Sequence, residues 1–176
     1  MKTIVIAEIG VNHNGSIFLA KKLIKKIAST GANYVKFQAF NPDLLVTPTA
    51  TLAGYQRKNL KQKITQKKML SKYALSEKQM HDLQKYSKKN RISFLLSIFD
   101  SESLKIVKKL KLNVLKIPSG EINNLPLLQE ISKLNIKVIL STGMANEKEI
   151  REAIKILTSK KIKKTGISLL QCNTDY

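Results

Sequence analysis

Short apolar runs alternate along the chain with longer segments in which apolar residues recur every three to four positions. The short runs are typical of buried strands, and the recurring pattern is typical of helices with one apolar face. We predict helices that begin after the capping residues Ser16, Ser76, Asp100, Asn124 and Asn146. We predict strands at residues 3–8, 33–38, 92–97, 113–117, 137–141 and 166–171.

This strict alternation of strand and helix predicts an α/β fold with a parallel sheet. The spacing suits a parallel (β/α) barrel of the TIM type, but such a barrel has eight strands and typically about 250 residues. The chain has 176 residues and six predicted strands, the last without its helix. We therefore expect one domain over residues 1–176, an incomplete barrel with about six of the eight strands.

Polar residues collect where each predicted strand ends. The fourth strand is the centre of this pattern, because Lys116, Ser119 and Glu121 follow one another as the strand turns into a loop. The carboxyl ends of parallel strands share one face, where α/β folds place their active sites. The six strand ends together supply Glu8, Lys36, Gln38, Ser97, Lys116, Ser119, Glu121, Ser141, Thr142, Asn173, Thr174 and Tyr176.

These residue types predict a site for an anionic substrate. Two lysines and several hydroxyls suit a phosphate and a carboxylate, and Glu8 and Glu121 could share acid–base work. The alternative is a structural network of ion pairs between the same groups. The irregular segment 39–75, which contains Asn59, is expected to include a long functional loop.

The net charge of +20 raises the question of nucleic-acid binding. Only three of the basic residues are arginines, the lysines are spread over nearly every predicted helix, and aromatic residues make up 6%. Because arginine is the preferred phosphate fork, we do not expect nucleic-acid binding as the main function. No apolar run approaches the roughly 20 residues of a membrane span, and a single cysteine fits a reducing compartment. We expect a cytoplasmic protein.

Residues that bind metals are sparse. His13 and His81 are the only histidines, and their spacing makes no metal-ligand pair. His81 is expected on a helix surface. His13 lies in the loop after the first strand and is expected to be structural, with a substrate contact as the alternative. Cys172 is expected to be a buried, inert thiol, with a reactive thiol as the alternative. The residues themselves therefore predict no metal site.

Five segments together resemble the sialic acid synthase family, and the match covers the whole chain in order. They are AEIGVNHNG at 7–15, VKFQ at 35–38, KIPSGEINN at 116–124, LSTGM at 140–144 and LLQCNTDY at 169–176. Pro118 and the ending from Cys172 are most similar to the N,N′-diacetyllegionaminate synthase branch. The resemblance implies that phosphoenolpyruvate condenses with an open-chain N-acetylated amino sugar. Carbon 3 of the enol attacks the sugar aldehyde, water attacks carbon 2, and phosphate leaves.

The resemblance also implies roles for the strand-end residues. Glu8 and Glu121 would lie near the reacting centre, without a decision on which activates water. Ser97 stands where the family commonly has Ser-Thr-Pro-Phe, so the hydroxyl contact there departs from the pattern. The implied phosphoenolpyruvate contacts are Lys36, Lys116, Ser119 and Ser141. Gln38 and Tyr176 are implied at the sugar or the rim of the site and Asn59 at the sugar, and Thr174 is a further expected substrate-binding residue.

A divalent metal, manganese or magnesium, is implied as the group that polarises the aldehyde. The family's two metal-binding histidines lie on later strands, beyond Tyr176. A homodimer is also implied, because the family's C-terminal antifreeze-like domain reaches a partner subunit's site. That domain too would lie beyond Tyr176. We therefore expect this chain alone to lack full activity.

Three alternatives stay open at this point. Another phosphoenolpyruvate-dependent aldol-type barrel, such as a relative of 3-deoxy-heptulosonate synthase, would turn over a sugar phosphate. A basic half-barrel could instead complement a partner chain or bind nucleic acid. A truncated product would have no function.

Overall fold

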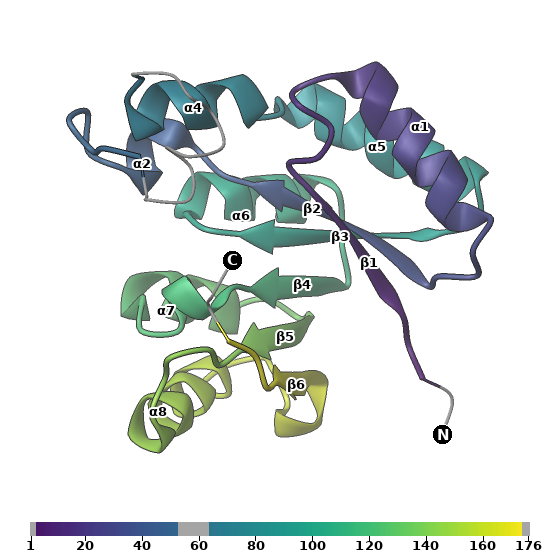
Figure 1. The fold of residues 1–176 in the computed structure, drawn as a ribbon. Coiled ribbons are helices and arrows are strands. Elements are labelled where there is room, and N and C mark those ends of the chain that lie inside the picture. The colour runs from purple at the N-terminus through teal and green to yellow at the C-terminus, as the bar shows by residue number, and fades with distance from the viewer. Residues whose placement is uncertain (1–2, 53–63, 174–176) are drawn as a thin grey trace. The chain divides into compact units, whose positions relative to one another are not determined.

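The structure is a computed structural model that describes residues 3–52 and 64–173. Its strands form one sheet in the order β1-β2-β3-β4-β5-β6 (Figure 1). They are β1 Ile6–Gly10, β2 Tyr34–Ala39, β3 Ser93–Ile98, β4 Val114–Ile117, β5 Lys137–Ser141 and β6 Ile167–Leu170. The recorded pairings β1–β2, β3–β4, β4–β5 and β5–β6 are all parallel. This confirms the predicted parallel sheet.

Helices separate successive strands, as the alternating pattern predicts. They are α1 Ile17–Ala28, α2 Pro42–Leu45, α4 Gln66–Tyr73, α5 Glu77–Lys89, α6 Ser101–Lys109, α7 Leu125–Ser132 and α8 Glu147–Leu157. Two short 3₁₀ helices, η1 Ser119–Glu121 and η2 Lys164–Gly166, complete the described elements. The six strands with intervening helices bear out the predicted fold class, a parallel α/β arrangement.

The described residues form two compact units. One contains the residues up to Phe94, and the other contains the residues from Leu95 onward. In the first unit β1 pairs with β2, and α1 packs beside α5. In the second unit β4, β5 and β6 pair in sequence, and α7 packs beside α8. The single domain expected from the sequence stays a prediction.

Each unit has its own apolar core. In the first, Ala20 and Ile24 of α1 are fully buried, as are Val35 and Phe37 of β2. Strands of a parallel sheet are covered on both faces and are therefore apolar at nearly every position. The core of the second unit follows the same rule, with Leu115, Ile117, Leu127, Leu128, Ile131, Val138 and Leu140 at most 3% exposed.

The helix starts agree with the capping residues predicted from the sequence. Ser16, Ser76, Asp100, Asn124 and Asn146 each accept a hydrogen bond from a backbone N–H of the first turn. Each such bond satisfies an N–H group that the helix itself cannot pair. The two caps before α5 and α8 are complete capping boxes, in which the side chain at the third helical position also returns to the cap.

The first strand differs from its prediction. It begins at Ile6 instead of residue 3 and continues to Gly10, beyond Glu8. The register shifts between Glu8 and Gly10, so Ile9 is an extra residue opposite β2. Such a bulge lengthens the strand and redirects it. Alternation of residue types does not reveal it, because the inserted residue is itself apolar.

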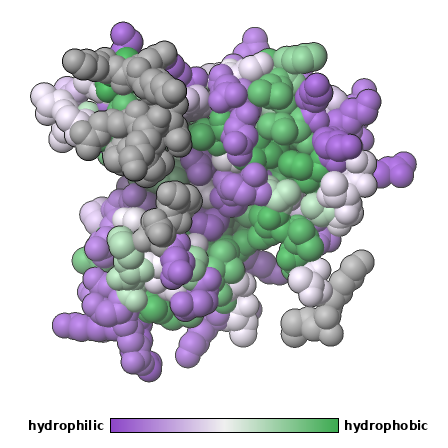
Figure 2. Space-filling view, in the orientation of Figure 1, coloured by the Kyte–Doolittle hydropathy of each residue, from purple (hydrophilic) through white to green (hydrophobic). Residues whose placement is uncertain are grey.

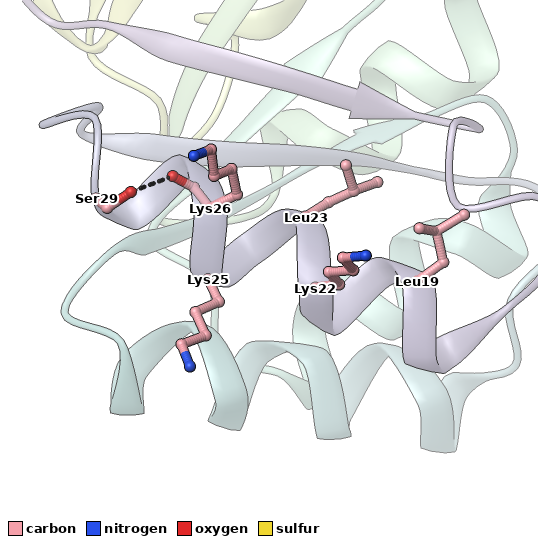
Figure 3. Close-up of a pocket in the computed structure, with 6 residues that line it drawn as sticks. All are labelled: Leu19, Lys22, Leu23, Lys25, Lys26 and Ser29. Carbon is pink, nitrogen blue, oxygen red and sulfur yellow. Dashed lines mark hydrogen bonds between the residues drawn. The ribbon is translucent and has the colours of Figure 1, made fainter.

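A groove of about 600 Å³ lies on α1, lined by Leu19, Lys22, Leu23, Lys25, Lys26 and Ser29 (Figure 3). Apolar side chains also gather on the face where α1 and β1 lie (Figure 2), and Ile4, Val5 and Phe18 are each more than half exposed. None of the polar strand-end residues that the structure describes lines this groove. Within the two described stretches, no helix is long and apolar enough to cross a membrane.

Candidate functional site

The first polar cluster lies in the first unit, on β1 and β2. Glu8 and Lys36 are opposite each other in the strand register, and the Lys36 ammonium forms an ion pair with the Glu8 carboxylate. Lys36 is only 8% exposed, whereas the Glu8 side chain remains 43% exposed. A buried lysine requires a charged or polar partner. The pair therefore holds a positive charge inside the unit, with its carboxylate open to solvent.

Gly10 shapes this cluster through its backbone. Its φ of +54° lies in the left-handed region, which glycine enters at no steric cost. A Cβ atom at this position would lie 2.9 Å from Glu8 Oε1 and 3.7 Å from Gln38 Nε2. The glycine thus leaves the space that the Glu8 carboxylate occupies. It also shows that the Gln38 amide lies close to the same point, as the spacing of Lys36 and Gln38 predicts.

His13 supports the loop that follows β1. Its ring is 1% exposed and lies 5.9 Å from the Phe37 ring, and its Nδ1 accepts a hydrogen bond from the Gly15 N–H at 3.0 Å. Burial lowers the pKa of the imidazole, although a backbone hydrogen bond with Gly10 acts in the opposite direction. The neutral ring is therefore favoured, and the prediction of a structural His13 agrees with these contacts.

The second unit carries Ser97 and Lys116 on neighbouring strands. They are partners in the register between β3 and β4, so their side chains leave the sheet on the same side. Ser97 is 1% exposed, and Lys116 is half-buried. This polar pair lies between the buried apolar residues Leu96 and Ile98 of β3 and Leu115 and Ile117 of β4.

Ser119, Gly143 and Cys172 form the second polar cluster, at the ends of β4, β5 and β6. The Gly143 N–H donates to Ser119 Oγ at 3.0 Å, and Cys172 Sγ lies 3.4 Å from the same oxygen. Ser141, the last residue of β5, is 4% exposed. Three consecutive strand ends thus place two hydroxyls, a thiol and a backbone N–H together.

The sequence prediction that Cys172 is buried is wrong. The side chain is only partly buried. Hydrogen bonding from the Ser119 hydroxyl, and to a smaller extent from Ser141 and the backbone of Thr142 and Gly143, lowers the pKa of the thiol, while burial opposes this shift. The sequence could not reveal this, because the stabilising donors come from two other strand ends.

Glu121 is engaged at the start of α7. Its Oε2 accepts a hydrogen bond from Asn124 Nδ2 at 2.7 Å, and Asn124 Oδ1 in turn accepts from the Leu127 N–H at 3.2 Å. A carboxylate near a helix N-terminus is favoured by the helix dipole. The structure therefore gives Glu121 a fixed position and a structural partner in addition to its predicted chemical role.

The predicted site residues divide into three groups. The first unit brings together Glu8, Lys36 and Gln38. The second unit brings Ser119 close to the end of β5, with Ser97 beside Lys116 in register and Glu121 at the next helix. Asn59, Thr174 and Tyr176 lie outside the described residues, and Asn173 is exposed. Gly10 and Gly143 were not predicted, because a backbone contact has no side-chain signature.

A metal ion finds no complete ligand set among residues 3–52 and 64–173. No group of three or more His, Cys, Asp or Glu side chains there could hold one. His13 uses Nδ1 for the Gly15 N–H, and His81 is exposed on α5. The described side chains therefore do not fit the metal that the resemblance implies, and we assign no chemical step of this chain to it.

Comparisons with known proteins agree with the predicted resemblance. The NeuB family profile matches residues 23–176. The chain is 47% identical over 175 residues to the N,N′-diacetyllegionaminic acid synthase of Campylobacter jejuni, covering 99% of this chain and 52% of that protein. It is 39% identical to the protein of the same name from Legionella pneumophila, covering all of this chain and 50% of the relative. The chain thus spans about half the length of these relatives.

Solved structures give the same result for the fold. The N-acetylneuraminic acid synthetase of Leptospira borgpetersenii, in complex with citrate, superposes with a TM-score of 0.81 at 30% identity, covering 100% of this chain and 56% of that one. A 3-deoxy-heptulosonate-type synthase of Thermotoga maritima superposes with a TM-score of 0.65 at 15% identity, covering 94% of this chain and 41% of that one, a likeness of fold alone. These matches confirm the barrel-type fold class, with six of the eight strands among the described residues.

Proposed function

The chain belongs to the NeuB family, and we propose that it forms the phosphoenolpyruvate-binding part of a nonulosonic acid synthase. The proposed reaction joins phosphoenolpyruvate to an open-chain N-acetylated amino sugar and releases phosphate. The names of the two relatives favour a sugar whose product is a diacetylated nonulosonic acid. The Thermotoga likeness, at 15% identity, carries no argument for the rival sugar-phosphate substrate.

The observation that carries this proposal is the pair of polar clusters at strand ends. Lys36 supplies a cation that is 8% exposed, and Lys116 supplies another on β4. The hydroxyls of Ser119, whose Oγ accepts the Gly143 N–H, and of Ser141 add possible hydrogen-bond donors at the ends of β4 and β5. Phosphoenolpyruvate carries a phosphate and a carboxylate, and such anions are bound best by charge-assisted hydrogen bonds from groups held in place.

The remaining roles follow from what each group can donate or accept. We propose that Lys36, Lys116, Ser119 and Ser141 contact phosphoenolpyruvate, and that Ser97 and Thr174 are further substrate contacts. The partly exposed Glu8 carboxylate can accept a proton from water, and Glu121 is the second candidate for this acid–base work. Gln38, Asn59 and Tyr176 are proposed for the sugar side.

The reaction needs these groups at two stages. When carbon 3 of the enol attacks the sugar aldehyde, positive charge develops at carbon 2, which an adjacent carboxylate stabilises. The aldehyde oxygen takes up the electron pair of its broken π bond and a proton and becomes a hydroxyl. Water then adds at carbon 2 and gives up a proton to a carboxylate. The bond from carbon 2 to the phosphate oxygen breaks as the new hydroxyl loses its proton to the departing phosphate and becomes the ketone. Lysines and hydroxyls that hold the phosphate stabilise it as it leaves.

The manganese or magnesium ion implied for the aldehyde would require ligands outside the described residues. A homodimer and a cytoplasmic location also stay predictions.

A chimera tests the proposed function. This chain is joined to the part of the Campylobacter jejuni synthase that its match does not cover. We expect the chimera to release phosphate from phosphoenolpyruvate only when the open-chain diacetylated amino sugar is present. The 176-residue chain alone is expected to lack full activity, because it spans about half of each relative. Phosphate release is measured with and without the sugar.

The controls separate chemistry from folding. Thermal unfolding followed by circular dichroism first establishes that the chimera folds. A Lys116→Ala chimera should then fold equally well and lose most phosphate release. A folded chimera that releases no phosphate, while the intact relative does so under the same conditions, would contradict the proposed function. Full activity of the isolated chain would contradict the expectation that it needs the remaining segment.

A further inference from the structure

In the second unit, Ser119 Oγ contacts residues that follow two other strands. Ser119 follows β4, Gly143 follows β5 and Cys172 follows β6. The oxygen accepts the Gly143 N–H at 3.0 Å and lies 3.4 Å from Cys172 Sγ. The distances alone do not decide whether the hydroxyl or the thiol donates in the second contact. The donor can be inferred by counting the protons and lone pairs of the groups involved.

A serine hydroxyl has one proton and two acceptor lone pairs. The Gly143 N–H occupies one lone pair of Ser119 Oγ. If the Cys172 thiol donates to the second lone pair, the Ser119 proton is left to donate to a ligand. If the hydroxyl donates to sulfur instead, Ser119 has no proton left for a ligand.

The neighbouring carbonyl of Leu170 favours the first arrangement. It accepts the Thr142 N–H at 3.1 Å and the Thr142 hydroxyl at 3.0 Å. A carbonyl oxygen has two lone pairs, so these two bonds occupy both. The Cys172 thiol can also donate a hydrogen bond to this oxygen, but at 3.6 Å this is the longest of the three bonds, and the two shorter ones already use the lone pairs. The thiol proton therefore has its better acceptor in Ser119 Oγ.

We propose that Cys172 is a positioning residue, whose thiol donates to Ser119 Oγ and thereby directs the Ser119 hydroxyl proton toward the phosphate group of phosphoenolpyruvate. This rests on the proposed function for the identity of the ligand. When the thiol loses its proton, the direction of this hydrogen bond reverses. A thiolate can only accept, so the Ser119 hydroxyl then donates to the sulfur and not to a ligand. Ligand binding and thiol ionisation are then mutually exclusive uses of one proton.

The surroundings of the sulfur support this coupling. Hydrogen bonding from Ser119 is the largest cause that lowers the pKa of Cys172, and the other contributing donors are Ser141 and the backbone of Thr142 and Gly143. No charged side chain is among these causes, and the Glu121 carboxylate bonds to Asn124. By linkage, a ligand that uses the Ser119 proton must raise the pKa of the thiol, and thiol ionisation must weaken the ligand equally.

The single cysteine makes this testable in the full chain. The rate of Cys172 alkylation by iodoacetamide, measured against pH, gives the pKa of its thiol, because the thiolate is the nucleophile. We expect a pKa below the ordinary 9.0 without ligand and a higher pKa with saturating phosphoenolpyruvate. Ser119→Ala should raise the pKa without ligand and remove the response to phosphoenolpyruvate. Ser159→Ala, at an exposed serine of the same unit, should change neither.

A second readout concerns affinity. Phosphoenolpyruvate binding to the unmodified chain should weaken as pH rises through the thiol pKa. Cys172→Ala should bind several-fold more weakly at neutral pH, without this pH dependence. Cys172→Ser supplies a donor that does not ionise, so its affinity should be restored and should also lose that dependence. A merely structural cysteine would produce no such separation between the two variants.

The outcomes distinguish failure of the Ser119–Cys172 contact from failure of phosphoenolpyruvate as the ligand. An unchanged thiol pKa in Ser119→Ala without ligand would overturn the positioning role, whatever phosphoenolpyruvate does. A normal Ser119→Ala effect with no response to phosphoenolpyruvate would support the Ser119–Cys172 contact and count against the proposed ligand. A thiol pKa that responds to both would support the inference as a whole.

Discussion

Replacing Lys36 or Lys116 with alanine is expected to weaken phosphoenolpyruvate binding by roughly 10- to 150-fold in each case. A hydrogen bond to a charged group contributes about 1.5–3 kcal/mol, which corresponds to this range. Lys36 lies in the first unit and Lys116 in the second. The loss is therefore expected for each lysine within its own unit. Titration calorimetry at low ionic strength measures the affinity, since salt screens such contacts.

The matched control is Lys148→Ala, which removes an exposed lysine from α8 of the second unit. It changes the net charge by the same amount and should leave the affinity within about twofold, because a solvated charge at a distance is largely screened. Equal effects of all three substitutions would indicate nonspecific attraction by a chain of net charge +20 and would refute the assigned site.

Gly15→Ala is expected to destabilise the protein by about 2–5 kcal/mol. The φ of Gly15 is +76°, and left-handed backbone costs a residue with a Cβ about 1–2 kcal/mol. The added Cβ would also lie 2.3 Å from the backbone oxygen of Lys72 in α4. Relieving such an overlap requires a backbone shift, which typically costs about 1–3 kcal/mol. Urea unfolding monitored by circular dichroism measures the change.

Gly31→Ala is the matched control for this substitution. Its φ is +81°, but a Cβ there would meet nothing within 4 Å. It should therefore show the conformational cost alone, about 1–2 kcal/mol. Equal losses at the two positions would mean that the loop after β1 does not pack against α4 as described.

Features that depend on residues close in sequence were predictable. Ser76 and Gln79 form a capping box whose two hydrogen bonds join residues three apart. Asn146 and Glu149 do the same before α8. The end of β5 at Ser141 was predicted as observed, because the apolar run and the following Thr-Gly sequence both mark it. Local chemistry determines these elements.

Features that depend on residues distant in sequence were not predictable in detail. The bulge at Ile9 is defined by the pairing of β1 with β2. The paired residues there are distant in sequence, since Glu8 and Lys36 are 28 residues apart. The environment of Cys172 is set by Ser119, 53 residues earlier. A sequence pattern locates such residues at strand ends, but their hydrogen bonds depend on how neighbouring strands align.

The ion pair of Glu8 with Lys36 is another feature that depends on residues distant in sequence. The sequence predicted both residues near the site, with a structural ion-pair network as the alternative. The structure does pair them, and the pairing compensates a lysine that is 8% exposed. Pairing and ligand binding are compatible, because a lysine ammonium has three donors and a carboxylate need not use all of them.

The most direct test of the central claim is an NMR titration of the full chain, labelled with ¹⁵N-lysine, with phosphoenolpyruvate. The Lys36 and Lys116 signals are assigned from Lys→Arg variants, and Lys148 serves as the internal reference. We expect the Lys36 and Lys116 signals each to shift along a saturable curve, while the Lys148 signal stays fixed. An unchanged Lys36 or Lys116 signal at saturating phosphoenolpyruvate would contradict the contact proposed for that lysine.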